Sequence, residues 1–322
     1  MTNHSRGWAL SLLGAVVVLA AGSLTSRGAP IAHASTSSRV LARWGPRACA
    51  RECEQDAPSA RFSSQVQLVE VYATVTDSRG GPVAGLRRED FEVYENDRLQ
   101  EVSAFAAGEF PLTVALGIDR SWSMAGDPLR LAKQASQAFL LALSPDDRSM
   151  VVAIGSDADV IAPLTMDRVS QSSAIAALDP WSTTALHDAV IATLDRLAPE
   201  PGRQALIVFS DGTDRYSRAT AAEAVERARR SNALIYPIAI GRERPPLLAE
   251  LAVMTGGRSF LLRDARDLEK ALAEVAKELR HQYLLGYAAD PADPQDPEWR
   301  SIRVVLKKPG LRVRARDGYM AD

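Results

Sequence analysis

The chain has 322 residues, of which 46% are hydrophobic and 24% are charged. These proportions are those of ordinary globular proteins, and they exclude a wholly disordered, collagen-like or coiled-coil chain. The 38 basic residues nearly balance the 40 acidic ones, which leaves a formal charge of -2. Nucleic-acid binding needs a concentrated positive surface, so this balance gives no reason to expect a nucleic acid as partner.

Residues 1–34 have the pattern of a secretory signal peptide. A short start that ends in the positive charge of Arg6 precedes the apolar run WALSLLGAVVVLAA. Such a run is too short to span a bilayer comfortably, since a spanning helix needs roughly 20 residues. Ala32 and Ala34 offer a small-x-small cleavage site. An uncleaved N-terminal membrane anchor is the alternative interpretation, and both predict export.

Residues 35–63 show no sustained periodicity and are typical of a flexible linker. This segment holds the two cysteines of the chain, Cys49 and Cys53. They can pair with each other or with another chain in an oxidising compartment, or they are incidental thiols.

Two short segments have strand patterns. Residues 64–108 alternate apolar and polar side chains before and after a turn at DSRGGP, and residues 281–322 contain the apolar runs YLLGY and IRVVL. Neither segment is large enough to bury a core alone. We therefore expect them to pair into one small β-sandwich, with residues 109–280 inserted between them.

Residues 109–280 alternate continuous apolar strands with helical patterns. The strands begin with LTVALGI at Leu112 and include ALIVF and ALIYPIAI, while the last helix is expected from Asp264 to Arg280. Such alternation predicts an α/β fold with a doubly wound, mostly parallel sheet.

Oxygen-bearing side chains follow two of these strands and precede one helix. Asp119, Ser121 and Ser123 come after LTVALGI, Asp211 comes after ALIVF, and Thr184 precedes the helix at Ala185. Ligand sites in open parallel sheets form at the carboxyl ends of strands, although each of these residues can also serve as a helix cap or turn residue. Hard oxygen ligands without a thiolate suit Mg²⁺, Mn²⁺ or Ca²⁺ better than zinc or copper.

These three loops, in this order, resemble the von Willebrand factor type A domain with its metal-ion-dependent adhesion site. The resemblance covers about residues 109–280, and the flanks VYATVTDSRGGPVAGLRREDFEVYEN, YLLGY and VRARDGY resemble a bacterial group of related proteins. It implies that a divalent cation keeps one position open for the carboxylate of a partner's Asp or Glu. It further implies that five residues form the metal site: Asp119, Ser121, Ser123, Thr184 and Asp211.

The chain departs from the family pattern at two places. Trp122 occupies the middle of the first loop, where a smaller residue is common, and Trp181-Ser182-Thr183-Thr184 lacks the glycines that are frequent in the threonine loop. The two tryptophans are either core residues or, together with Asp214, candidates for contact with the partner.

The sequence favours a binding protein over an enzyme. It contains neither a Gly-x-Ser-x-Gly elbow nor a phosphate-binding loop, and no catalytic residues are predicted. The leading hypothesis is a secreted, periplasmic or cell-envelope adhesion-type module that binds a partner protein through its cation and touches membrane only through an uncleaved anchor. One alternative is an assembly or maturation factor for a cell-envelope complex. Another is a metal-dependent hydrolase in which His187 serves as a base.

Overall fold

The computed structural model describes residues 67–290 and 298–321. The expected signal peptide (1–34) and linker (35–63), with both cysteines, lie outside these residues. Within the described ranges, no helix has both the length and the apolar character needed to cross a bilayer.

A six-stranded sheet forms the centre of the α/β part. Its strand order is β10-β9-β8-β5-β6-β7, and all neighbours are parallel except β6 and β7. The strands are β5 (Leu112–Asp119), β6 (Arg148–Ile154), β7 (Ala158–Thr165), β8 (Arg203–Ser210), β9 (Ala233–Ile240) and β10 (Phe260–Leu262). Every residue of β5 and β8 is buried, as in strands covered on both faces. The predicted mostly parallel α/β sheet is confirmed.

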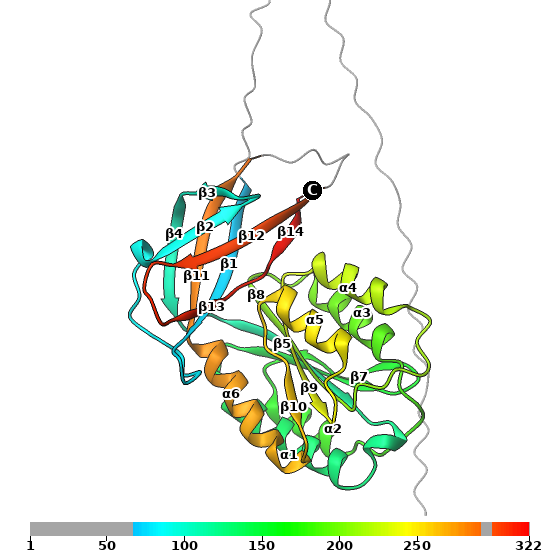
Figure 1. Ribbon diagram of the computed structural model, residues 1–322. Coiled ribbons are helices and arrows are strands. Elements are labelled where there is room, and N and C mark those ends of the chain that lie inside the picture. Colours follow the sequence, from blue (N-terminus) through cyan, green and yellow to red (C-terminus); the bar gives the residue numbers. More distant parts are fainter. Residues whose placement is uncertain (1–66, 291–297, 322) are drawn as a thin grey trace, which may run out of the picture. The chain divides into compact units, whose positions relative to one another are not determined.

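Helices cover both faces of this sheet (Figure 1). Alternate residues of β5 point to opposite faces, so Leu116 joins one apolar cluster with α1, α2 and α6, whereas Ala115 joins a second cluster with α3, α4 and α5. Within the described ranges the α-helices are α1 (Asp127–Ala142), α2 (Arg168–Ala176), α3 (Leu186–Leu197), α4 (Ala221–Arg229), α5 (Pro246–Thr255) and α6 (Leu268–Arg280).

Two helices differ from the sequence expectation. The last helix begins at Leu268, because Asp264 Oδ1 accepts a hydrogen bond from the Arg266 backbone N–H at 2.9 Å and caps the 3-10 turn η3 (Ala265–Asp267) instead. Helix α2 was not predicted. Its sequence RVSQSSAIA buries only Gln171 and Ile175, so it lacks a periodic apolar stripe.

The two flanking segments form one β-sandwich of two antiparallel four-stranded sheets, with strand orders β13-β1-β11-β4 and β14-β12-β2-β3. β1 pairs with β11 from Gln67 opposite Ala289 to Thr74 opposite Gln282, and β2 pairs with β12. Figure 1 shows these early and late strands side by side. The strands are β1 (Gln67–Thr76), β2 (Phe91–Glu95), β3 (Arg98–Gln100), β4 (Val102–Gly108), β11 (Gln282–Ala289), β12 (Glu298–Leu306), β13 (Arg312–Arg314) and β14 (Gly318–Ala321). The prediction of an α/β domain inserted into a small sandwich is therefore confirmed.

Arg203, the first residue of β8, connects the α/β part to the strands that leave it. Its buried guanidinium donates hydrogen bonds to the Phe110 carbonyl at 2.5 Å, to the Leu279 carbonyl, and to Gln282 Oε1 at 3.1 Å. Gln282 in turn donates to Thr74 Oγ1 at 2.9 Å. The Arg203 side chain thus bonds to both chain segments that connect the α/β part to the sandwich.

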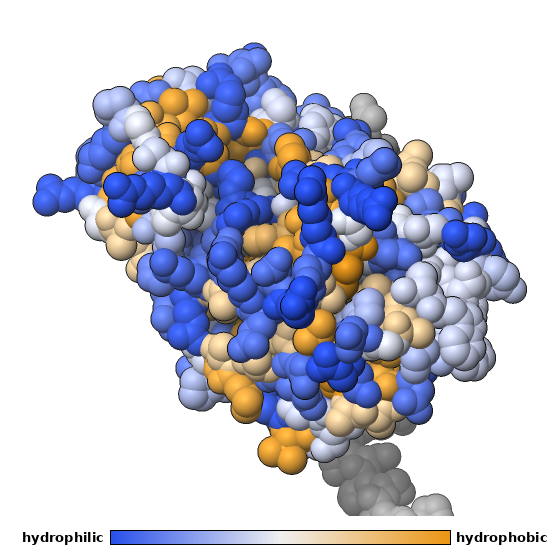
Figure 2. Space-filling view, turned by 60° about the horizontal axis from the view of Figure 1, so that its bottom comes forward, coloured by the Kyte–Doolittle hydropathy of each residue, from blue (hydrophilic) through white to orange (hydrophobic). Residues whose placement is uncertain are grey.

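One face of the molecule is largely polar (Figure 2). Figure 2 shows a face on which hydrophilic side chains predominate and hydrophobic ones occur in small, scattered groups. Exposed apolar side chains such as Leu141, Val169 and Val253 lie singly on three different helices, as is common in folded proteins.

Candidate metal centre

Asp119, the last residue of β5, joins the ends of two neighbouring strands. Its carboxylate is fully buried; Oδ1 accepts a hydrogen bond from the Ser121 backbone N–H at 2.9 Å, and Oδ2 accepts one from the Ser210 hydroxyl at 2.6 Å. Because β5 and β8 are parallel neighbours, both deliver their carboxyl-terminal residues to the same edge of the sheet. Asp211 follows Ser210 at this edge and is half-buried.

The loop after β5 presents two hydroxyl groups. Ser121 Oγ and Ser123 Oγ lie 3.0 Å apart, with Ser121 buried and Ser123 exposed. Ser123 belongs to the 3-10 turn η2 (Trp122–Met124), and Ser121 directly precedes this turn. Met124, the last residue of the turn, is buried and anchors the loop to the core. The sequence alternates hydroxyl and apolar side chains here, and the turn places both hydroxyls together.

The threonine loop is bonded to both other loops. The Trp181 backbone N–H donates to the Arg120 carbonyl at 2.7 Å, and the Trp122 N–H donates to the Ser182 carbonyl at 3.2 Å. On its other side, the carbonyl of the buried Thr184 accepts hydrogen bonds from the N–H groups of Arg215 at 3.0 Å and Tyr216 at 3.1 Å. With the Asp119–Ser210 bond, these contacts close a ring of hydrogen bonds through all three loops.

The loop without glycine adopts its geometry at a cost. Ser182 has a φ of 68°, a left-handed conformation that non-glycine residues seldom adopt. Ser182 therefore takes the backbone conformation for which a glycine is better suited, and its carbonyl forms the bond to Trp122.

The charges at this edge favour a cation. Burial raises the pKa of Asp119; hydrogen bonds from Ser121 and Ser210 lower it, and the nearby negative charge of Asp211 raises it further. Two carboxylates and three hydroxyls are a donor set that fits a hard divalent cation. No group of three or more His, Cys, Asp or Glu side chains suited to a metal occurs within the described ranges.

The five predicted ligands are not all linked in the same way. Asp119, Ser121 and Ser123 are joined by direct hydrogen bonds, whereas Asp211 adjoins Ser210 and Thr184 is joined through its backbone. Their role as metal ligands stays a prediction. No role was predicted for Ser210, although its place at the end of β8 is the signal that could have revealed one.

Asp214 and His187 hold the loop after β8 to helix α3. Asp214 Oδ2 accepts from the His187 backbone N–H at 3.0 Å and from Ser217 Oγ at 2.5 Å, and Oδ1 accepts from the Ser217 N–H at 3.2 Å. His187 Nδ1 lies 3.0 Å from the Ala219 carbonyl oxygen. Asp188, for which no role was predicted, accepts from the backbone N–H groups of two further loop residues, Arg218 and Ala219, both at 2.9 Å. These side chains position the loop, which leaves Asp214 little freedom to contact a partner.

Three exposed aromatic side chains belong to these same loops. Trp122 is 66% exposed, Trp181 52% and Tyr216 62%, so neither tryptophan is a core residue. The Arg120 guanidinium stacks on the Trp181 ring, with its central carbon 5.4 Å from the ring centroid. Tyr216 was not singled out from the sequence, because no helical or strand period marks a loop residue as exposed.

A family model, von Willebrand factor type A domain, matches residues 114–274. No curated protein matches this chain. Among solved structures, the conserved hypothetical protein BatB from Bacteroides thetaiotaomicron is 20% identical, with a TM-score of 0.43 over 52% of this chain and 98% of that one.

Two further solved structures are similar to this chain. A von Willebrand factor type A protein from Catenulispora acidiphila is 18% identical, with a TM-score of 0.48 over 81% of this chain and 75% of that one. Proximal thread matrix protein 1 from the mussel byssus, with a zinc-occupied MIDAS motif, is also 18% identical, with a TM-score of 0.49 over 58% of this chain and 50% of that one.

Proposed function

The chain belongs to the von Willebrand factor type A domain family, and we propose that it is an exported protein-binding module that holds a divalent cation at the candidate metal centre. In this proposal Ser121, Ser123 and Thr184 hold the cation directly or through water, while Asp119 and Asp211 position these groups. Mg²⁺ suits such oxygen ligands best, with Mn²⁺ or Ca²⁺ as substitutes. A bound cation supplies the positive charge that attracts an Asp or Glu carboxylate of the partner protein.

The observation that carries this proposal is the closed ring of hydrogen bonds through the three loops. Asp119 bonds to Ser121 and Ser210, and Thr184 is bonded to the loop after β8. Side chains held in this way need little further ordering when a cation binds, because their supporting contacts are already made.

The exposed aromatic side chains extend the proposal from the cation to the partner. Trp122, Trp181 and Tyr216 belong to the same three loops as the proposed ligands and lie largely in solvent. Aromatic residues are enriched at protein interfaces because they bury a large area with few rotatable bonds. We assign them the contacts that surround the partner's carboxylate.

Export rests on the sequence of residues 1–34. A short apolar run behind a positive charge is typical of a secretory signal, and an uncleaved anchor would leave the module attached to the membrane. In either case the module would face partners in the cell envelope or outside the cell.

Calorimetric titration of the full chain with MgCl₂ and MnCl₂ tests the metal site. We expect one saturable binding event, which Asp119→Ala and Thr184→Ala abolish. Asp179→Ala is the matched control, since Asp179 is an exposed carboxylate in the loop before Trp181, and it should bind the cation normally. Equal binding by Asp119→Ala and the unmodified chain would contradict the proposal.

Capture from an envelope extract tests the partner. A partner should be retained by the immobilised chain in Mg²⁺, released by EDTA, and absent with Asp119→Ala. Trp122→Ala should weaken capture while leaving cation binding intact. Capture that is indifferent to EDTA would separate partner binding from the metal centre and defeat the proposed mechanism.

A further inference from the structure

One edge of strand β1 has no partner strand over most of its length. β11 pairs with β1 along Gln67–Thr74, whereas β13, on the opposite side, pairs only with Thr74–Thr76. From Leu68 to Ala73 the β13 side of β1 is therefore unpaired within the described ranges. An unpaired edge presents a row of free N–H and C=O groups that another strand can bond.

The backbone groups of three residues face this free edge. Next to Val75, β13 occupies one side of β1. The Val83 N–H donates to the Val75 carbonyl at 2.9 Å from the other side, beyond the end of β11, so the backbone groups of Val75 point to the β11 side. Because direction alternates along a strand, those of Leu68, Glu70 and Tyr72 point to the free side. The residues between them bury their side chains in the sandwich core.

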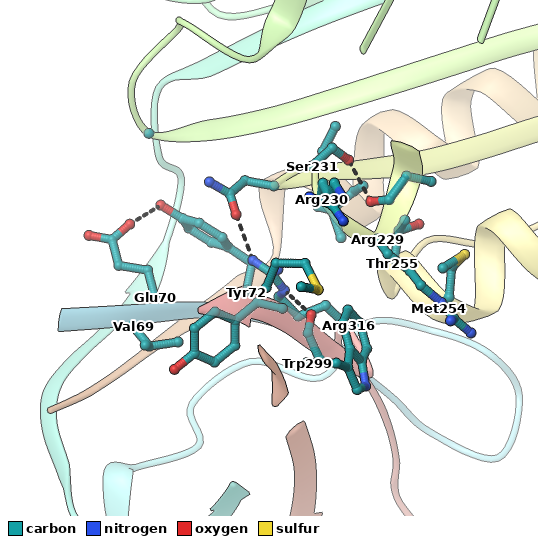
Figure 3. A pocket seen from close by; sticks show the side chains of 18 of the residues that line it. Val69, Glu70, Tyr72, Arg229, Arg230, Ser231, Met254, Thr255, Trp299 and Arg316 are labelled. Atoms are coloured by element: carbon teal, nitrogen blue, oxygen red, sulfur yellow. Dashed lines mark hydrogen bonds between the residues drawn. The ribbon is translucent and has the colours of Figure 1, made fainter. Parts of the chain in front are cut away.

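The free edge lies in a cavity of about 540 Å³ (Figure 3). β14, which among the described strands pairs only with β12, lines it from the other sheet of the sandwich. The turns that lead into β8 and β9 line it from the α/β part. These turns lie at the amino ends of the parallel strands. The candidate metal centre lies at the carboxyl ends, so the two sites are separate.

Two arginines give this cavity positive charge. Arg316 Nε donates to the Gly318 carbonyl and Nη1 donates to Asn232 Oδ1, both at 2.7 Å, and Arg229 stacks on Trp299 with its central carbon 5.4 Å from the ring centroid. Neither arginine forms an ion pair with any described residue, although Asp317 acts on both through space. Burial lowers the pKa of Arg316 to about 10, which still leaves it charged at neutral pH.

The acidic side chains of the cavity are engaged elsewhere. Glu200 pairs with Arg148 at 2.5 Å, and Glu70 accepts a hydrogen bond from the Tyr72 hydroxyl at 3.1 Å on the outer face of β1. Arg230 is likewise paired, with Glu226 at 2.9 Å. Arg229 and Arg316 are therefore the charges available to a ligand.

We propose that this cavity is a peptide-binding groove, in which an extended acidic segment of a partner protein adds as a strand to the free edge of β1. Main-chain hydrogen bonds to Leu68, Glu70 and Tyr72 would hold the segment, and its carboxylates would face Arg229 and Arg316. Addition of a strand to a sheet edge is a recurrent mode of peptide recognition, in which the main chain gives affinity and side-chain contacts give specificity. This inference is independent of the metal centre.

Fluorescence anisotropy with a short fluorescein-labelled peptide of alternating Glu and Val tests the groove on the full chain. EDTA is present throughout, so that the peptide's carboxylates cannot report on a bound cation. We expect saturable binding that Arg229→Gln and Arg316→Gln each weaken about tenfold, as the loss of a charge-assisted hydrogen bond does. Arg196→Gln, an exposed arginine on α3 outside the groove, should bind as the unmodified chain does.

Hydrogen–deuterium exchange distinguishes strand addition from a purely electrostatic contact, because only strand addition slows exchange of the backbone amides on the free edge of β1. The peptide should slow exchange at the amides of Leu68, Glu70 and Tyr72, and a peptide N-methylated at alternate residues should neither bind nor protect them. Equal binding by the N-methylated peptide, or by a peptide with Lys in place of Glu, would overturn the proposal. If free N-acetylglutamate displaces the labelled peptide as well as the unlabelled peptide does, the groove is a site for small anions instead. If the peptide binds only after residues 35–63 are deleted, this segment of the chain itself, and not a partner protein, is the ligand of the groove.

Discussion

Burial in the fold disfavours the charged form of the Asp119 carboxyl. Among the described residues, Ser121 and Ser210 donate hydrogen bonds to the buried carboxyl. Its pKa is raised, chiefly by burial and further by Asp211. A carboxyl whose folded pKa lies above its unfolded value lowers the free energy of unfolding as the pH rises through that raised pKa. At neutral pH, without a cation, Asp119 is therefore expected to destabilise the fold.

Replacing Asp119 by Asn should separate this stability cost from metal binding. In EDTA at neutral pH, we expect Asp119→Asn to melt at the same temperature as the unmodified chain or higher, because the buried charge is gone. Added Mg²⁺ should raise the melting temperature of the unmodified chain, as a ligand of the folded state does, but not that of the variant. Thermal melting followed by circular dichroism measures both effects.

Asp188→Asn is the matched control for this comparison. Asp188 accepts hydrogen bonds from the backbone N–H groups of Arg218 and Ala219, so its loss should lower the melting temperature in both conditions and leave the Mg²⁺ effect in place. An Asp119→Asn protein that Mg²⁺ still stabilises would show that the cation binds elsewhere.

Ser182 is the second residue at which sequence and geometry conflict. Its φ of 68° costs a non-glycine residue about 1 kcal/mol or more. We expect Ser182→Gly to raise the free energy of unfolding by about 1 kcal/mol relative to Ser182→Ala, as measured by urea denaturation. A glycine variant less stable than the alanine variant would mean that the left-handed conformation is not retained in solution.

At the scale of single residues, the sequence indicated which residues gather at the edge of the sheet, because each follows a strand or precedes a helix. It did not indicate how they are connected. Asp119 and Ser210 are 91 positions apart in the chain, and the bond between them depends on the pairing of β5 with β8. The backbone bonds from Tyr216 and Arg215 to Thr184 have no sequence pattern at all.

At the scale of elements, Arg203 shows how one side chain fixes the ends of three segments. It is 4% exposed and bonds the chain before β5, the end of α6 and the start of β11. We expect Arg203→Met to lower the free energy of unfolding by about 3 kcal/mol, because buried carbonyl groups then lose a charged donor. Urea denaturation measures the change.

Arg148→Met tests whether that loss comes from burial. Arg148 begins β6, which is separated from β8 by β5, and pairs with Glu200 at 2.5 Å, but its side chain is 43% exposed. An exposed pair contributes less than about 1 kcal/mol, so this variant should be nearly as stable as the unmodified chain. Similar losses in both variants would argue against a special role for Arg203.

The elements that the sequence predicted are those with a strong apolar period. The continuous runs of β5, β8 and β9 were located to within two residues, since only a doubly covered strand tolerates such runs. The short strand β14 was missed, because its Gly318 is required by packing and not by pattern. A Cβ atom at Gly318 would lie 2.3 Å from the Trp299 ring.

At the scale of the whole molecule, the order of the strands along the chain differs from their order in space. The sandwich core combines Val71 and Val93 from the first segment with Leu285 and Tyr287 from the last. Sequence reasoning reached this arrangement only from the small size of each segment. The buried Glu95, which accepts hydrogen bonds from Tyr287 at 2.6 Å and Tyr319 at 2.9 Å, could not be predicted, because its position at the end of β2 looks like part of a polar hairpin tip.

The register of two strands suggests that the sandwich can fold without the inserted part. Gly108, the last residue of β4, lies directly opposite Gln282, the first residue of β11. A two-residue Asn-Gly turn closes such an antiparallel pair. A chain in which Asn-Gly replaces residues 109–281 therefore keeps every strand pairing of both sandwich sheets.

We expect this shortened chain to give a β-type circular dichroism spectrum and a cooperative urea transition. It should be less stable than the full chain, because contacts such as Arg314 Nη2 to Glu278 at 2.6 Å and the Asp317 N–H to the Met254 carbonyl at 2.9 Å are lost. Residues 64–108 alone should be unfolded, since β1 and β2 then lack β11 and β12. A stable fold of residues 64–108, or an unfolded shortened chain, would show that the flanking segments do not form one independent core and would overturn the boundaries that we propose at 108 and 281.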